Sequence, residues 1–142
     1  MVDEAVQPLP PSKVLVVDDN AQQLELLLAY MEELPEVTAV PAMDGEEALG
    51  CVDTDRPDLI LLDLMIPKIS GFEVCRRLKN NPETREIPIV MVTALSETGD
   101  IERAVECGTD DFLNKPVNRV ELITRVRNLL RLRHLKRDLD TP

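Results

Sequence analysis

Residues 13–20 read KVLVVDDN, an apolar and largely β-branched run that ends abruptly in two carboxylates and an amide. A strand that is apolar throughout, rather than alternating, is buried on both faces, which is typical of a parallel sheet covered by helices. Asn20 is a residue type that caps helices, and apolar residues recur at helical spacing after it, from Leu24 to Met31, before Pro35. This stretch therefore predicts a buried strand that leads directly into a helix.

The same strand and helix pattern recurs along the chain. Besides 13–17, we expect strands at 37–40, 59–62, 87–92 and 112–113. We expect helices after Asn20, at 45–52 behind Asp44, at about 72–78, at about 98–107, and from Asn118 to about residue 135 or beyond. Five strand–helix units with short connections predict an α/β domain of the doubly wound class, with one parallel sheet between two helical layers.

Polar residues collect where the predicted strands end. Asp18 and Asp19 end the first strand, Asp63 the third, Thr93 the fourth and Lys115 the fifth. Ligands of doubly wound folds bind at this edge of the sheet. Three carboxylates repel one another unless a cation is present, and an oxygen-only cluster with open positions suits Mg²⁺. With a lysine for an anion and a hydroxyl to donate a hydrogen bond, the set describes a phosphoryl-transfer site.

Other chemistries lack their signatures. A single aspartate after a strand is usually a helix cap, but capping does not explain the adjacent pair Asp18-Asp19 or five such residues on four strands. The chain has no GxxxxGK[ST] loop, no GxGxxG after a strand and no GxSxG elbow. His134 lies in the C-terminal segment, far along the chain from any nucleophile, and we interpret it as a surface residue.

The distribution of charged residues limits the kinds of partner that the protein can bind. Residues 1–114 carry 24 acidic and eight basic residues, whereas residues 115–142 carry three acidic and eight basic ones. An acidic body argues against direct DNA binding, because phosphate contacts need clustered Lys and Arg. No signal peptide or membrane-spanning run is evident, and three cysteines without CxxC spacing are expected to be reduced packing residues. We therefore expect a cytoplasmic protein without a membrane contact.

The motifs resemble those of the receiver domain of two-component response regulators, which is CheY-like. The matching segments are 14–20, 61–67 with Gly71, 91–94 and 108–116, in family order over about residues 12–135. The resemblance implies a flavodoxin-like (βα)₅ fold with strand order 2-1-3-4-5 and helices on both faces. With the Pro-rich opening and the basic residues of the last helix, we expect a flexible Pro-rich leader at 1–11, a receiver domain at 12–130 and a basic extension of the last helix at 131–142.

The resemblance further implies that Asp63 is the phosphoacceptor, which attacks phosphohistidine on a sensor histidine kinase or a histidine phosphotransfer protein. Asp19 and Asp63, with the backbone carbonyl of Met65, are implied to bind Mg²⁺, for which Mn²⁺ can substitute. Asp18 is implied to act mostly through water. The chain is thus expected to be a phosphoacceptor that takes part in its own phosphorylation and dephosphorylation, and not an enzyme.

Lys115 and Thr93 are implied to hold phosphoryl oxygens, with a cis peptide bond between Lys115 and Pro116. Thr93 and Phe112 are implied to be the switch residues that transmit phosphorylation to the face formed by 98–107, 112–113 and the last helix. Met65 and Leu95 occupy positions that influence acyl-phosphate hydrolysis in the family. Since both are apolar, we expect a long-lived phosphoryl group.

The last helix carries a second apolar stripe, Leu132, Leu135 and Leu139, beyond the part that a receiver needs. Such extensions join a receiver to an output domain or form a homodimer, so the chain is either a single-domain regulator or the receiver portion of a longer protein. Two other readings stay open. One is a Mg²⁺-dependent aspartyl phosphatase or phosphotransferase, although the DxD spacing is missing from the first strand. The other is a non-phosphorylated scaffold.

Overall fold

The structure is a computed structural model that describes residues 8–94, 102–103 and 105–140. Its elements follow the order β1 (Ser12–Val17), α1 (Ala21–Met31), β2 (Val37–Ala42), α2 (Gly45–Asp55), β3 (Leu59–Leu62), α3 (Gly71–Lys79), β4 (Ile89–Thr93), β5 (Asp111–Asn114) and α5 (Arg119–Asp140). In this part of the chain the five strands form one parallel sheet in the order β2-β1-β3-β4-β5. The predicted doubly wound fold and strand order are confirmed.

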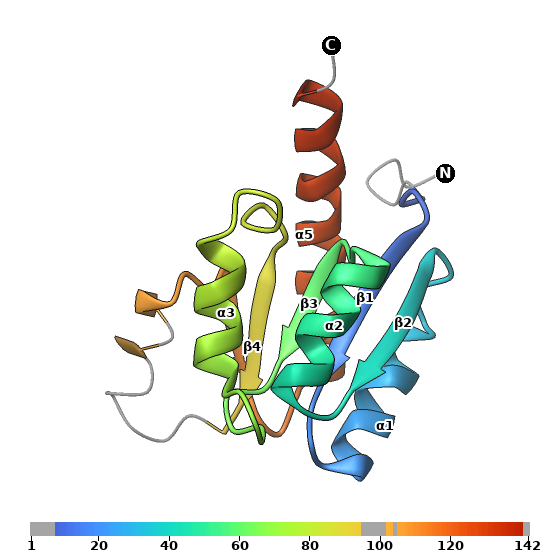
Figure 1. Cartoon of the computed structure of the whole chain (residues 1–142). Coiled ribbons are helices and arrows are strands. Elements are labelled where there is room, and N and C mark those ends of the chain that lie inside the picture. Colours follow the sequence, from blue (N-terminus) through green and yellow to red (C-terminus); the bar gives the residue numbers. More distant parts are fainter. Residues whose placement is uncertain (1–7, 95–101, 104, 141–142) are drawn as a thin grey trace.

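Helices cover both faces of the sheet, with α2 and α3 on one side and α1 and α5 on the other (Figure 1). Alternate residues of β1 serve the two layers: Leu15 and Val17 pack with the α2 and α3 side, whereas Val14 and Val16 pack with the α1 and α5 side. Because each such side chain stabilises the fold by roughly 1.5–3 kcal/mol when fully buried, a strand without polar residues is favoured at this position.

The predicted helix starts are confirmed. The side chains of Asn20, Asp44 and Asn118 each accept a hydrogen bond from the backbone N–H three residues later, at 2.9, 2.7 and 2.9 Å. Ser70 caps α3 in the same way, at 3.2 Å from the nitrogen of Glu73, and the sequence analysis did not single it out. Short side-chain acceptors therefore set the start of every helix whose cap the structure describes.

Several boundaries differ from the prediction. β2 runs on through Pro41, which an edge strand tolerates because one side of its backbone has no ladder to satisfy. β4 begins only at Ile89, and β5 extends to both sides of the expected 112–113. The helix expected at about 98–107 lies partly outside the described residues, of which 102–103 and 105–106 are helical.

The two ends of the predicted domain differ in how they relate to the sheet. Of the expected leader, residues 1–7 lie outside the described part, and Leu9 packs into the α1 and α5 layer. At the other end α5 is one continuous helix that passes residue 130 and extends beyond the sheet (Figure 1). No described helix has both the length and the apolarity that crossing a bilayer requires.

Candidate phosphoryl-transfer site

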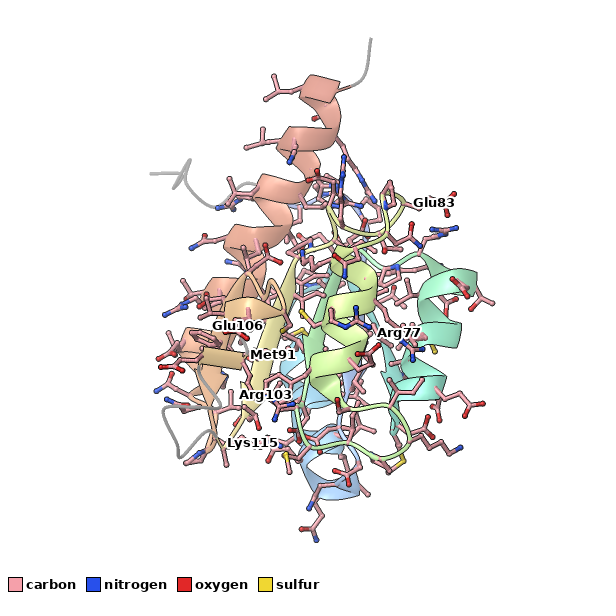
Figure 2. The ribbon with its side chains drawn as sticks, turned by 60° about the vertical axis from the view of Figure 1, so that its left-hand side comes forward. Arg77, Glu83, Met91, Arg103, Glu106 and Lys115 are labelled. Carbon is pink, nitrogen blue, oxygen red and sulfur yellow. The ribbon has the colours of Figure 1, made fainter. Side chains whose placement is uncertain are left out.

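Backbone hydrogen bonds bring the strand ends together. The N–H of Asp63 donates to the carbonyl of Val17 at 3.0 Å, which sets the end of β3 beside the end of β1. The N–H of Lys115 likewise donates to the carbonyl of Thr93 at 3.1 Å and aligns the residue after β5 with the last residue of β4. The parallel register therefore delivers the predicted residues to one edge of the sheet, where Figure 2 shows Lys115.

Lys115 joins the two buried carboxylates of the site. Its Nζ donates to Oδ2 of Asp18 at 2.7 Å and to Oδ2 of Asp63 at 2.8 Å. Asp18 is 1% exposed and Asp63 6% exposed, so little water screens these contacts. Partial burial disfavours the ammonium, but hydrogen bonds to Asp18 and Asp63 outweigh it, and the pKa of Lys115 is raised above its ordinary value. The lysine is therefore held as a cation between the two acids.

The second oxygen of each buried carboxylate is held by the backbone. Oδ1 of Asp18 accepts from the N–H of Asn20 at 2.9 Å, and Oδ1 of Asp63 accepts from the N–H of Met65 at 3.1 Å. Both contacts span two residues, so each aspartate is oriented by the turn that follows its own strand. The two carboxylates are thereby fixed before any ligand binds.

The donor set fits a hard divalent cation. Asp18, Asp19 and Asp63 each offer a carboxylate oxygen, and the three atoms lie within 4.8 Å of one another. Three carboxylates against one ammonium leave an excess of negative charge, and oxygen ligands with an open side suit Mg²⁺. Asp19 is exposed whereas the other two are buried, so the cluster is open to solvent on its Asp19 side.

Gly71 allows the approach of α3 to the phosphoacceptor candidate. A Cβ at this position would lie 2.2 Å from the carbonyl oxygen of Asp63 and 2.7 Å from Cα of Leu64. The N–H of Gly71 also donates to the carbonyl of Leu64 at 3.0 Å. The backbone after Asp63 is thus pinned against the start of α3. The sequence motif contained this glycine without a role for it, and the available signal was its place directly after the capping residue Ser70, at the first position of the helix.

The remaining predicted residues lie around this centre. Thr93 is buried at the end of β4, and Phe112 is half-buried on β5, opposite Met91 and against the α2 and α3 layer. The Lys115–Pro116 peptide bond is cis, as expected. The side chain of Met65 is 76% exposed, while Leu95 lies outside the described residues. That the Met65 carbonyl binds a metal and that Thr93 and Phe112 switch remain predictions.

His134 is less exposed than the surface position that we predicted for it. Its ring is half-buried, and Nε2 lies 2.8 Å from Oγ of Ser12 at the amino-terminal edge of the sheet. Arg137 pairs nearby with Asp58 at 2.7 Å. This edge is opposite the carboxylate cluster, so His134 does not belong to the candidate site.

Comparisons with known proteins agree with this geometry. The model of the response regulator receiver domain matches residues 14–127. The chain is 47% identical over 123 residues to the response regulator PleD of Caulobacter vibrioides, an alignment that covers 86% of this chain and 27% of PleD. The chain thus spans about a quarter of the length of that relative.

Two solved structures are similar throughout the domain. The signal receiver domain of a signal transduction histidine kinase from Syntrophus aciditrophicus has a TM-score of 0.79 at 38% identity, covering 84% of this chain and 89% of that chain. The receiver domain of a sensor histidine kinase from Pseudomonas aeruginosa PAO1 has a TM-score of 0.77 at 28% identity, covering 84% and 97% respectively. That second structure contains a magnesium ion coordinated in its active site cleft.

Proposed function

The chain belongs to the response regulator receiver domain family, and from that premise we propose that it accepts a phosphoryl group on Asp63 from a phosphohistidine. The observation that carries the proposal is the position of the Lys115 ammonium, within 2.8 Å of both Asp18 and Asp63. A cation at this point attracts a dianionic phosphoryl group to the carboxylate that is to receive it.

In the transfer, a carboxylate oxygen of Asp63 forms a bond to phosphorus while the histidine N–P bond breaks. The electron pair of that bond returns to the imidazole nitrogen, which leaves neutral after protonation. The product on Asp63 is an acyl phosphate. Since Asp63 is oriented by the N–H of Met65 and by Lys115, its carboxylate loses little rotational freedom when it reacts.

Around the acceptor, Lys115 and the hydroxyl of Thr93 hold the phosphoryl oxygens. Asp18, Asp19 and Asp63, with the carbonyl of Met65, hold Mg²⁺ or, in its place, Mn²⁺, and Asp18 does so mostly through water. When bound, this cation neutralises charge that develops on the phosphoryl oxygens. The magnesium ion in the similar Pseudomonas receiver domain supports this assignment.

Phosphorylation of Asp63 changes the packing of residues on and beside β5. The new dianion shifts Thr93, and Phe112, which is half-buried against the α2 and α3 layer, turns behind it. The face that changes comprises the helical residues 102–103 and 105–106, β5 and α5. Its partners are a second copy of the chain or an output domain, and the phosphoryl donor is a sensor histidine kinase or a histidine phosphotransfer protein.

The test is phosphorylation by a small donor. The purified chain is incubated with Mg²⁺ and acetyl phosphate, and its intact mass is measured. We expect one phosphoryl adduct that disappears in Asp63→Ala and in samples treated with EDTA, while the exposed-site control Asp53→Ala keeps it. Turnover of acetyl phosphate without an adduct would support an aspartyl phosphatase instead, and neither adduct nor turnover would support a scaffold.

A further inference from the structure

Two cysteines meet between α3 and the chain that leads into β5. Cys75 is fully buried on α3, and Cys107 is 9% exposed, just after the helical residues 105–106. Sγ of Cys75 lies 3.3 Å from the carbonyl oxygen of Cys107, although 32 residues separate them. Cys51 is half-buried on α2, where its pKa is raised by burial.

The pair is chemically asymmetric. The hydrogen bond from Cys75, with contributions from the N–H groups of Thr109 and Cys107 and from Arg103, outweighs burial and lowers the pKa of Cys107 to about 7. The pKa of Cys75 is raised, because it donates to Cys107 and is buried. Since the thiolate is the nucleophile in thiol chemistry, Cys107 is suited to attack and Cys75 to resolve.

Cys107 lines a cavity of about 330 Å³ between α3 on one side and Arg103 and Glu106 on the other. Arg76 and Arg103 line it, together with two carboxylates, and Figure 2 shows Arg103 and Glu106 on this side of the molecule. The guanidinium of Arg103 packs 4.0 Å from the centre of the Phe72 ring, which keeps it at the wall. The charged groups around the pair are Glu73, Arg76, Lys79, Arg103, Glu106 and Asp110.

We propose that Cys75 and Cys107 are a reversible redox site, which a low-molecular-weight disulfide such as glutathione disulfide converts into an intramolecular disulfide. The Cys107 thiolate attacks one sulfur of glutathione disulfide, which forms a mixed disulfide and releases one glutathione thiolate. Cys75 then gives up its proton and attacks the sulfur of Cys107, which releases the second glutathione. Two protein thiols are oxidised, one external disulfide is reduced to two thiols, and the protons pass to the leaving groups.

The disulfide would join α3 to the residue that precedes β5 by four positions. Cys75, Cys107 and Met91 belong to one core cluster, and Phe112 packs against that cluster. A covalent bond here would therefore restrain the segment through which, under the proposed function, phosphorylation is transmitted. The redox chemistry itself does not depend on Asp63.

The experiment uses the full chain, reduced and folded, with glutathione disulfide at pH 8, followed by alkylation, intact mass and peptide mapping. We expect a loss of two hydrogens in one Cys75–Cys107 peptide, with Cys51 alkylated. Cys51→Ser serves as the matched control and should form the same bond. Cys75→Ser should stop at one glutathione adduct on Cys107, and Asp63→Ala should oxidise at the wild-type rate, which separates this test from that of the proposed function.

The pH dependence gives a second readout that needs no variant to fold. Between pH 6 and pH 8 the thiolate fraction of a cysteine with a pKa of about 7 rises about tenfold, whereas an ordinary thiol with a pKa of 9.0 gives about a hundredfold rise. We expect the initial rate of modification of Cys107 to follow the tenfold rise. Cys51 reacting first, a hundredfold rise at Cys107, or a mixed disulfide that never resolves in the wild type would each overturn the proposal.

Discussion

Nζ of Lys115 lies 2.8 Å from Oδ2 of Asp63, although 52 residues separate the two in the sequence. The same ammonium lies 2.7 Å from Oδ2 of Asp18. One cation thus compensates two carboxylates that are almost fully buried side by side, and one of them is the carboxylate that we propose bonds to phosphorus. The residue that stabilises these two carboxylates is therefore also the residue that we expect to hold the phosphoryl group.

Replacing Lys115 by Met should destabilise the fold in EDTA, because it leaves two buried carboxylates without a partner. Breaking a fully buried pair costs about 3–5 kcal/mol, but the Lys115 side chain is 20% exposed, so we expect a loss of about 1–3 kcal/mol in urea unfolding at pH 7. Lys136→Met is the matched control. Its ion pair with Glu86 is half-exposed, and its loss should change the free energy of unfolding by less than about 1 kcal/mol. Equal losses in the two variants would contradict the central role of Lys115.

Gly71→Ala should impair both stability and phosphorylation. The new Cβ would meet the backbone of Asp63 and Leu64, which cannot move aside as a flexible side chain can, so we expect a loss of roughly 1–3 kcal/mol. Because the displaced atoms belong to Asp63 itself, adduct formation with acetyl phosphate should slow by at least several-fold at a temperature where the variant is folded.

Gly50→Ala is the control for that variant. Gly50 lies in α2 with no atom within 4 Å of an added Cβ, so alanine should stabilise the helix by about 0.5–1 kcal/mol and leave the phosphorylation rate unchanged. If both glycine variants lost stability to the same extent, the contact with Asp63 would not be the cause.

The fold was predictable because its central strands consist almost entirely of apolar residues. Leu59–Leu62 has no polar residue and is buried on both faces, so it reports a central parallel strand by itself. The edge strand was harder: Val37–Ala42 is only partly buried and contains a proline, and its end was misplaced. Burial made the central strands recognisable, but it did not fix their limits, since the fully buried β4 begins at Ile89 and not at residue 87.

The sequence was sufficient to predict which residues of the site lie at the same edge of the sheet, because parallel strands bring their carboxyl ends together. Two features were beyond that reasoning. That Lys115 bridges both Asp18 and Asp63 depends on side-chain conformations. That Cys75 and Cys107 touch depends on how α3 packs against a segment 32 residues away, which spacing does not encode.

The acyl phosphate on Asp63 should persist for minutes or longer. Met65, whose N–H already contacts Asp63, presents a thioether side chain that is 76% exposed and cannot orient an attacking water. Met65→Asn supplies an amide at that point and should shorten the half-life several-fold, measured from the decay of the phosphorylated mass after the donor is removed. Leu26→Asn, an exposed position on α1, should leave the half-life unchanged. A wild-type half-life of seconds would contradict the expectation.

The exposed leucines of α5 should mediate self-association. Leu132, Leu135 and Leu139 are 62%, 58% and 85% exposed, and their spacing of three and four residues forms one seam along the part of the helix that extends beyond the sheet. Such a seam is buried when two helices pack together. In light scattering we expect the measured mass to rise toward that of a dimer as the protein concentration increases, and to stay that of a monomer when all three leucines are replaced by Gln.

Since these side chains have few contacts to lose, the free energy of unfolding of the triple variant at low concentration should change by less than about 1 kcal/mol. Val120→Gln, exposed near the other end of α5, should still associate, and a wild-type chain that stays monomeric at every concentration would refute the assignment.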